Sequence, residues 1–141
     1  MTSAPRKLSP TRFYGVWRLE RWELWRDGEL YAYPHGEIST GQIIYSSAGV
    51  MSAVLQNPDW PKSGDDGPPV YESFLSYSGL WRVEGQDVHH DVHFASISSW
   101  VGRRLTRRAV FGRKQLRLES PPQMDRRGRK LVNRVFWRKD A

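Results

Sequence analysis

Residues 88–102, VHHDVHFASISSWVG, decide the interpretation of this chain, because a strand-like pattern there places one polar ring among apolar side chains. With the two-residue period of a β-strand, Val88, His90, Val92 and Phe94 share one face. An apolar row of this kind faces an interior. We therefore expect His90 to be buried, either as a satisfied core histidine or as a group in a pocket.

The composition predicts one ordered domain that is rich in strands. The chain has 141 residues, of which 38% are hydrophobic and 13% aromatic, and it contains no cysteine. Aromatic residues favour strands and also line small-molecule pockets. The absence of cysteine excludes disulfides, thiolate metal sites and cysteine nucleophiles. We expect residues 1–11, which are polar and contain two prolines, to be a flexible arm. Residues 12–141 are then a single barrel domain.

Neither a signal peptide nor a membrane span is visible in the sequence. The first fifteen residues lack an apolar run of signal-peptide length. No segment approaches the roughly 20 apolar residues that a spanning helix needs. The expectation is a cytoplasmic protein without a membrane partner.

Charge is distributed unevenly along the chain. Residues 1–102 hold 8 Lys and Arg against 12 Asp and Glu, a net charge of −4, whereas residues 103–141 hold 14 against 3, a net charge of +11. One end of the fold should be basic, either as a solvated face or as a surface for anions or nucleic acid. Strand alternation distributes the arginines of residues 103–113 over two faces, which counts against a nucleic-acid-binding stripe.

Alternating segments separated by turn signals predict eight to ten sequential strands. Residues 13–26 alternate, with a bulge expected near Trp22, and Asp27-Gly28 is a hairpin signal. Residues 57–69 contain four prolines and two glycines around Trp60, so this loop is either a lid over a pocket or a plug. Residues 70–78 show helical spacing, and we expect one short helix there that closes a barrel end. The fold class predicted is all-β, an up-and-down antiparallel barrel.

Several short motifs follow one another in a fixed order along nearly the whole chain. They are GVWRL at 15–19, PHG at 34–36, GQIIY at 41–45, MSA at 51–53, YSGLW at 77–81, HH at 89–90, WVG at 100–102, then Arg107, PP at 121–122 and Trp137. In this order they resemble the bacterial and fungal lipocalin-like domains. That resemblance implies an up-and-down barrel with a central cavity. It also implies either plain ligand binding or an enzyme of natural-product biosynthesis that cyclises or isomerises a bound substrate.

His90 and Arg107 are the candidate catalytic residues. Arg107 shares its face with apolar side chains, so it is a charged group on an apolar row. A buried arginine needs a partner, which is either a ligand carboxylate, phenolate or enolate, or an internal acid such as Glu20 or Glu72. Arg107 could orient an anion and stabilise an enolate, while His90 could move a proton near neutral pH.

An excess of aromatic side chains in a barrel of this size predicts an aromatic ligand-binding wall. Its expected members are Trp17, Tyr33, Tyr45, Trp60, Tyr77, Trp81, Phe94 and Trp100. No metal is expected, because His89 and His93 lie about 13 Å apart along a strand. No cofactor is expected either, because no glycine-rich phosphate loop follows a strand.

Three functional hypotheses follow from these features. The first is a barrel that binds a small, mostly apolar or aromatic, and in one variant anionic, molecule and acts as a cofactor-independent cyclase or isomerase. The second is a carrier with the same cavity and no turnover. The third, which the arginine distribution weakens, is nucleic-acid binding through the basic C-terminal third. The sequence leaves open whether the protein forms a homodimer.

Overall fold

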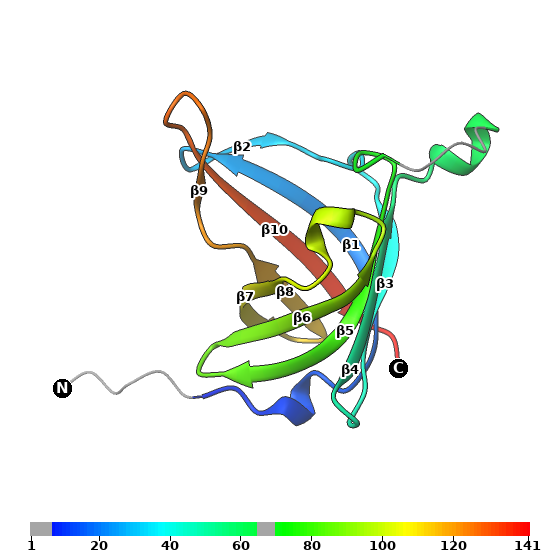
Figure 1. Ribbon diagram of the computed structural model, residues 1–141, viewed down its shortest axis with the longest axis vertical. Helices are drawn as coiled ribbons and strands as arrows, with labels where there is room; N and C mark the ends of the chain where they lie inside the picture. The colour runs from blue at the N-terminus through cyan, green and yellow to red at the C-terminus, as the bar shows by residue number, and fades with distance from the viewer. Residues whose placement is uncertain (1–6, 65–69) are drawn as a thin grey trace.

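The structure, a computed structural model, describes residues 7–64 and 70–141. These residues contain ten β-strands and three short 3-10 helices, joined by turns and loops (Figure 1). The strands are β1 (Gly15–Arg26), β2 (Glu29–Ala32), β3 (Thr40–Tyr45), β4 (Val50–Gln56), β5 (Phe74–Glu84), β6 (Asp87–Ala95), β7 (Arg104–Gly112), β8 (Gln115–Glu119), β9 (Gln123–Met124) and β10 (Lys130–Lys139). The helices are η1 (Pro10–Arg12), η2 (Trp60–Ser63) and η3 (Ser98–Trp100). Residues 1–6 of the expected arm and 65–69 of the expected lid lie outside the described residues.

The predicted up-and-down antiparallel barrel is confirmed. Neighbouring strands follow the order β1-β3-β4-β5-β6-β7-β8-β10, and β10 pairs back onto β1 from Trp17 opposite Lys139 to Arg26 opposite Leu131. This closing pair removes the exposed edges that an open sheet would leave. β2 and β9 are short strands that pair with the ends of β1 and β10.

Two bulges decide which side chains face the interior. In β1 the register shifts between Leu19 and Arg21, so Leu19 and Trp22 are both buried although they are three residues apart. The bulge expected near Trp22 is thus confirmed. In β6 the register shifts after Val92. Val92 pairs with Gly79, but the next pair is Phe94 with Ser78, so β6 advances two residues where β5 advances one.

The bulge in β6 overturns the prediction that Phe94 shares the inward face of His90. The extra residue in this strand reverses the alternation, and Phe94 points outward with 71% of its surface exposed. Gly79 lies at the same place, where an added Cβ would be 1.9 Å from the carbonyl oxygen of Asp91. Strands β5 and β6 approach this closely because Gly79 has no side chain.

The prediction of a helix over residues 70–78 is wrong. Residues 71–73 form a turn, and β5 begins at Phe74, pairing with β4 from the Phe74–Gln56 pair onward. Leu75 and Tyr77 alternate inward as buried residues, as the two-residue period of a strand requires, whereas residues two apart lie on opposite sides of a helix. The available edge of β4 decides between strand and helix. Pairing with β4 satisfies a row of backbone N–H and C=O groups, whereas a single helical turn leaves most of its own without hydrogen bonds.

Aromatic side chains fill one end of the barrel. Phe13, which follows η1 and is fully buried, packs against three rings at centroid distances of 4.9–5.5 Å, those of Tyr45, Trp81 and Phe111. The indole nitrogen of Trp17 donates a hydrogen bond to the carbonyl oxygen of Phe13. The chain before β1, which lies at this end of the barrel in Figure 1, therefore seals it.

Candidate functional site

A cavity of about 580 Å³ occupies the half of the barrel opposite Phe13. This volume suits a small-molecule ligand. Strands β1, β4, β5, β7, β8, β9 and β10 and helix η3 contribute to its walls. The residues that line it are Trp22, Leu55, Tyr71, Leu75, Tyr77, Trp100, Arg103, Arg104, Leu105, Thr106, Arg107, Leu118, Ser120, Pro121, Gln123, Asn133, Val135 and Trp137.

A chain of edge-to-face aromatic contacts forms one wall of the cavity. Tyr77 lies 5.5 Å from Trp100, Trp100 lies 6.4 Å from Tyr71, and Tyr71 lies 5.4 Å from Trp22, measured between ring centroids. Trp100 ends η3, the single turn between β6 and β7 that directs its indole over the cavity. Such contacts hold each ring in place and give the cavity an aromatic, largely apolar wall.

Tyr71 is further fixed by a buried histidine. His35 is completely buried, and its Nε2 lies 2.6 Å from the backbone carbonyl oxygen of Tyr71, so it donates that hydrogen bond. Its ring also lies 4.8 Å from that of Trp22. Burial lowers the pKa of His35, which keeps the ring neutral. His35 thus fixes two residues that line the cavity.

Arg107 places a positive charge in this cavity. Its Nη1 donates to the backbone carbonyl oxygen of Thr106, and within the described ranges it forms no ion pair with a carboxylate. The two internal acids considered from sequence do not serve it. Glu20 pairs with Arg21 and Arg138, and Glu72 is exposed.

The charge of Arg107 acts on the rings around it. Burial raises the pKa of Tyr71 to about 12, with the positive charge of Arg107 opposing that rise. Burial also raises the pKa of the Tyr45 and Tyr77 hydroxyls, and Arg107 again acts in the opposite direction. The positive charge of the Arg107 guanidinium therefore acts on the hydroxyls of Tyr45, Tyr71 and Tyr77.

Beneath the cavity, His90 joins two tyrosines. Its Nε2 lies 2.6 Å from the Tyr45 hydroxyl, and its Nδ1 lies 3.1 Å from the Tyr77 hydroxyl. Burial, and then the charge of Arg107, lower the pKa of His90 to about 3. A neutral imidazole has one donor and one acceptor, so one tyrosine donates to His90 while the other accepts from it. His90 is fully buried and reaches the cavity through Tyr77.

The described wall of the cavity carries hydrogen-bond donors and positive charges but no negative charge. Three arginines line it, and no Asp or Glu does among the described residues. Trp137 also lines it, and its buried indole nitrogen has no hydrogen-bond partner in the described part of the chain. A buried donor without an acceptor is costly, so a ligand that supplies acceptor oxygens would stabilise this arrangement.

Seven of the ten residues predicted from sequence lie inside the barrel, at three levels. Arg107, Tyr77 and Trp100 line the cavity, and His90 and Tyr45 lie directly below it. Trp17 and Trp81 belong to the filled end. The remaining three do not line the cavity: Tyr33 follows β2 and is half-buried, Trp60 packs on Phe74 at 5.1 Å, and Phe94 is on the outer face.

Sequence reasoning missed three aromatic members of the cavity wall. Regular alternation puts Trp22 on the face opposite Trp17, and only the bulge between Leu19 and Arg21 brings it inward. Tyr71 falls in the segment for which the sequence predicts a helix. Trp137 carried a usable signal, since Asn133, Val135 and Trp137 recur with period two and all line the cavity. Asn133 also accepts a hydrogen bond from the Trp22 indole at 2.9 Å.

Fold and site together define a class of protein, the antiparallel β-barrels that are closed at one end and bind a small molecule inside. The family described as lipocalin-like domain matches residues 14–139, and the chain belongs to this family of small-molecule-binding barrels. Comparisons with curated proteins and with solved structures gave no match. None of the helices in residues 7–64 and 70–141 is long and apolar enough to cross a membrane. The same residues contain no cluster of three or more His, Asp or Glu suited to a metal ion.

Proposed function

We propose that this protein binds a small aromatic or apolar anion in its central cavity, with the anionic group against Arg107. One observation carries the proposal, the guanidinium that lines an aromatic cavity in which no described side chain supplies a negative charge. A partly desolvated charge without a counterion is costly, and a ligand carboxylate, phenolate or enolate removes that cost. Tyr77 and Trp100 offer the aromatic surface for the rest of the molecule.

Two fluorescent probes of similar shape test this proposal. 1-Anilinonaphthalene-8-sulfonate carries an anionic group, and N-phenyl-1-naphthylamine lacks it. We expect the sulfonate to bind at least about tenfold more tightly at low salt, because a charge-assisted contact with Arg107 is worth more than a neutral one. Titration followed by probe fluorescence and tryptophan quenching gives both dissociation constants. Equal affinities, or a preference for the neutral probe, would contradict the proposal.

A second candidate function, an isomerase, is supported by the hydrogen-bond chain Tyr45–His90–Tyr77. When Tyr45 donates to Nε2 and Nδ1–H donates to Tyr77, the Tyr77 proton is free to point toward a ligand. In the opposite tautomer Tyr77 donates to Nδ1 and offers the ligand a lone pair. Tyr77 can therefore act as either an acid or a base toward an enolisable substrate, and Arg107 would stabilise the enolate.

Phenylpyruvate, an aromatic keto acid that enolises, tests the isomerase candidate. We expect the wild-type protein to accelerate its keto–enol exchange, measured by ultraviolet absorbance and by deuterium exchange at the methylene carbon. Tyr77→Phe should lose about 10²-fold of this acceleration and keep the affinity for phenylpyruvate, because general acid–base contributions are of that size. If wild type and Tyr77→Phe give equal rates, Tyr77 has no such role and binding alone remains.

A further inference from the structure

We propose that the protein docks on the surface of an anionic lipid bilayer through one corner of its open end. This basic corner consists of Arg26, Tyr31, Met124, Arg126, Arg127 and Lys130, from the tips of the β1–β2 and β9–β10 hairpins. The two tips are joined, because the Asp27 amide donates to the Lys130 carbonyl oxygen and the Lys130 amide donates to Asp27 Oδ1. Docking of this kind goes beyond ligand binding in the cavity.

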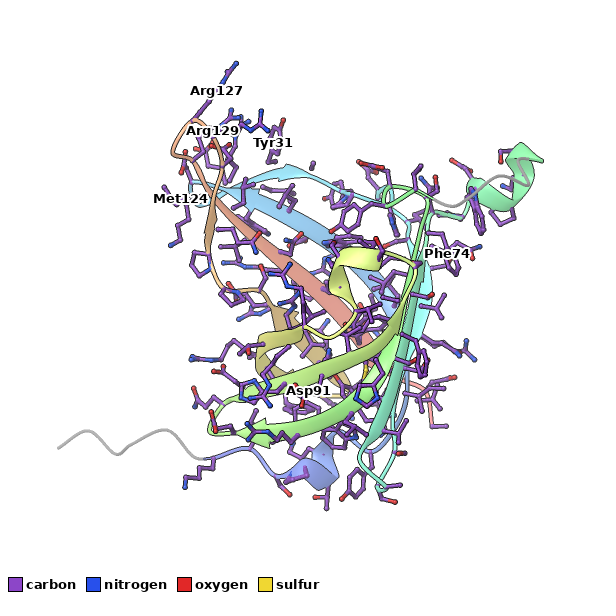
Figure 2. The ribbon with its side chains drawn as sticks, in the orientation of Figure 1. Tyr31, Phe74, Asp91, Met124, Arg127 and Arg129 are labelled. Atoms are coloured by element: carbon purple, nitrogen blue, oxygen red, sulfur yellow. The ribbon has the colours of Figure 1, made fainter. Side chains whose placement is uncertain are left out.

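The basic corner presents apolar side chains to the outside. Met124 is 66% exposed and Tyr31 is 54% exposed. Figure 2 shows Tyr31, Met124, Arg127 and Arg129 gathered at the same corner of the barrel and directed away from its body. Exposed apolar side chains beside cations are the combination that binds the interfacial region of a membrane.

Cations of the basic corner differ from those of the barrel wall in their ion pairs. On the wall, Arg104 contacts Asp91 at 2.7 Å and Arg108 contacts Asp87 at 2.9 Å. By contrast, the side chains of Arg126, Arg127 and Lys130 form no ion pair with a described carboxylate. Their positive charge is therefore free to act on an external partner.

The acids of this region do not cancel that charge. Asp125 contacts Arg129 at 2.7 Å and accepts hydrogen bonds from the Arg127 and Arg129 amides. Asp27 accepts from the Lys130 amide, which leaves Glu29 as the remaining acid at the two tips within the described residues. The four basic residues of the corner, together with Arg129, thus face three acidic ones, two of which already hold hydrogen-bond donors.

An anionic bilayer fits this surface better than a nucleic acid does. Arg26 lies 3.8 Å over the ring of Tyr31, and such amphipathic pairs suit the headgroup region. Met124 has an apolar side chain that a phosphate backbone would leave exposed, whereas the boundary between headgroups and acyl chains would bury it. The sequence expectation of no membrane partner rested on the absence of a spanning segment, and surface docking needs none.

The position of the basic corner links docking to the cavity. Gln123 lines the cavity, and its neighbour Met124 belongs to the basic corner. Docking therefore turns the mouth of the barrel toward the bilayer, where an apolar molecule would enter or leave with little exposure to water.

Vesicle co-sedimentation with the full chain tests the proposal. Vesicles of phosphatidylcholine with phosphatidylglycerol are compared with vesicles of phosphatidylcholine alone. We expect binding to the anionic vesicles that weakens with salt, and a loss of at least about tenfold in the double variant Arg126→Glu/Arg127→Glu. Met124→Ser should weaken binding by a smaller factor, about threefold, because it removes apolar contact and no charge.

A matched control separates the basic corner from net charge. Arg113→Glu/Lys114→Glu changes the charge equally at the β7–β8 turn, where the Lys139 amide donates to the Lys114 carbonyl oxygen at the filled end. Equal losses in the two double variants would overturn the proposal. Equal binding to neutral and anionic vesicles would also overturn it, as would tighter binding to an oligonucleotide than to vesicles. The same holds if the wild type binds no vesicles but forms a dimer that dissociates in the corner variant. An unchanged thermal unfolding midpoint of the corner variant confirms that it is folded.

Discussion

Arg107→Met is expected to weaken binding of 1-anilinonaphthalene-8-sulfonate by at least about 30-fold and to leave binding of the neutral naphthylamine nearly unchanged. Truncating one partner of a buried, hydrogen-bonded charge pair costs about 2 kcal/mol or more, which corresponds to this factor. Methionine retains most of the side-chain volume, so the cavity should keep its shape. Fluorescence titration of both probes against wild type and variant provides the measurement.

The same substitution should move stability in the opposite direction. Without ligand, Arg107 is a cation with no described carboxylate partner, and methionine relieves the cost of keeping it there. The thermal midpoint of the ligand-free variant should therefore rise, as is common when a functional group is removed from a binding site. A lower midpoint together with unchanged sulfonate affinity would assign Arg107 a structural role instead.

Arg108→Met is the matched control for both measurements. Arg108 is the next residue of β7, it points outward, and its guanidinium contacts Asp87 at 2.9 Å. Because it lies on the other side of the sheet, its loss should leave the affinity for the sulfonate within about twofold, as an exposed ion pair contributes little. A similar loss of sulfonate affinity in both variants would mean that overall charge attracts the probe.

His90→Leu is expected to reduce the free energy of unfolding at pH 7 by about 3 kcal/mol. The substitution leaves the hydroxyls of Tyr45 and Tyr77 buried without their present partner, and each unsatisfied group costs about 1–3 kcal/mol. Urea denaturation followed by tryptophan fluorescence measures the change. A loss below about 1 kcal/mol would show that the two hydroxyls find other partners.

The difference between wild type and His90→Leu should shrink as the pH falls. The pKa of His90 is about 3 in the folded protein and about 6.5 in an unfolded chain. The unfolded state therefore takes up a proton first, and wild-type stability declines as the pH falls from about 6.5 toward 3. Leucine does not titrate, so we expect the two unfolding free energies to converge near pH 4.5, where wild type has lost about 3 kcal/mol through this group.

Two histidines serve as references for this pH profile. Burial also lowers the pKa of His35, but His35 is present in both proteins and its contribution cancels in the difference. His93→Gln replaces an exposed histidine of the same strand, and it should leave the free energy of unfolding at pH 7 unchanged. A pH-independent gap between wild type and His90→Leu would contradict the assignment of a neutral, buried His90.

Period-two patterns were sufficient to predict the barrel and the inward row that carries His90. Burial of His90 follows from its apolar neighbours Val88 and Val92, which are also buried. The same argument on β7 predicted an inward-facing Arg107, and the structure has it lining the cavity. Local alternation is reliable where a strand has no bulge, because one face then packs on the interior and the other meets water.

What the sequence by itself determined is the all-β class, the strand order along the chain, and the pair of polar groups set in apolar rows. Tertiary structure alone decided which aromatic rings fill the barrel and which line the cavity. A single extra residue in β1 or β6 reverses every later side chain, and nothing local fixes where that residue is placed. Its place depends on the partner strand, as with Gly79 opposite the bulge that turns Phe94 outward. Likewise, the absence of a described acid beside Arg107 is a fact about distant strands brought together, and periodicity along one strand carries no information about it.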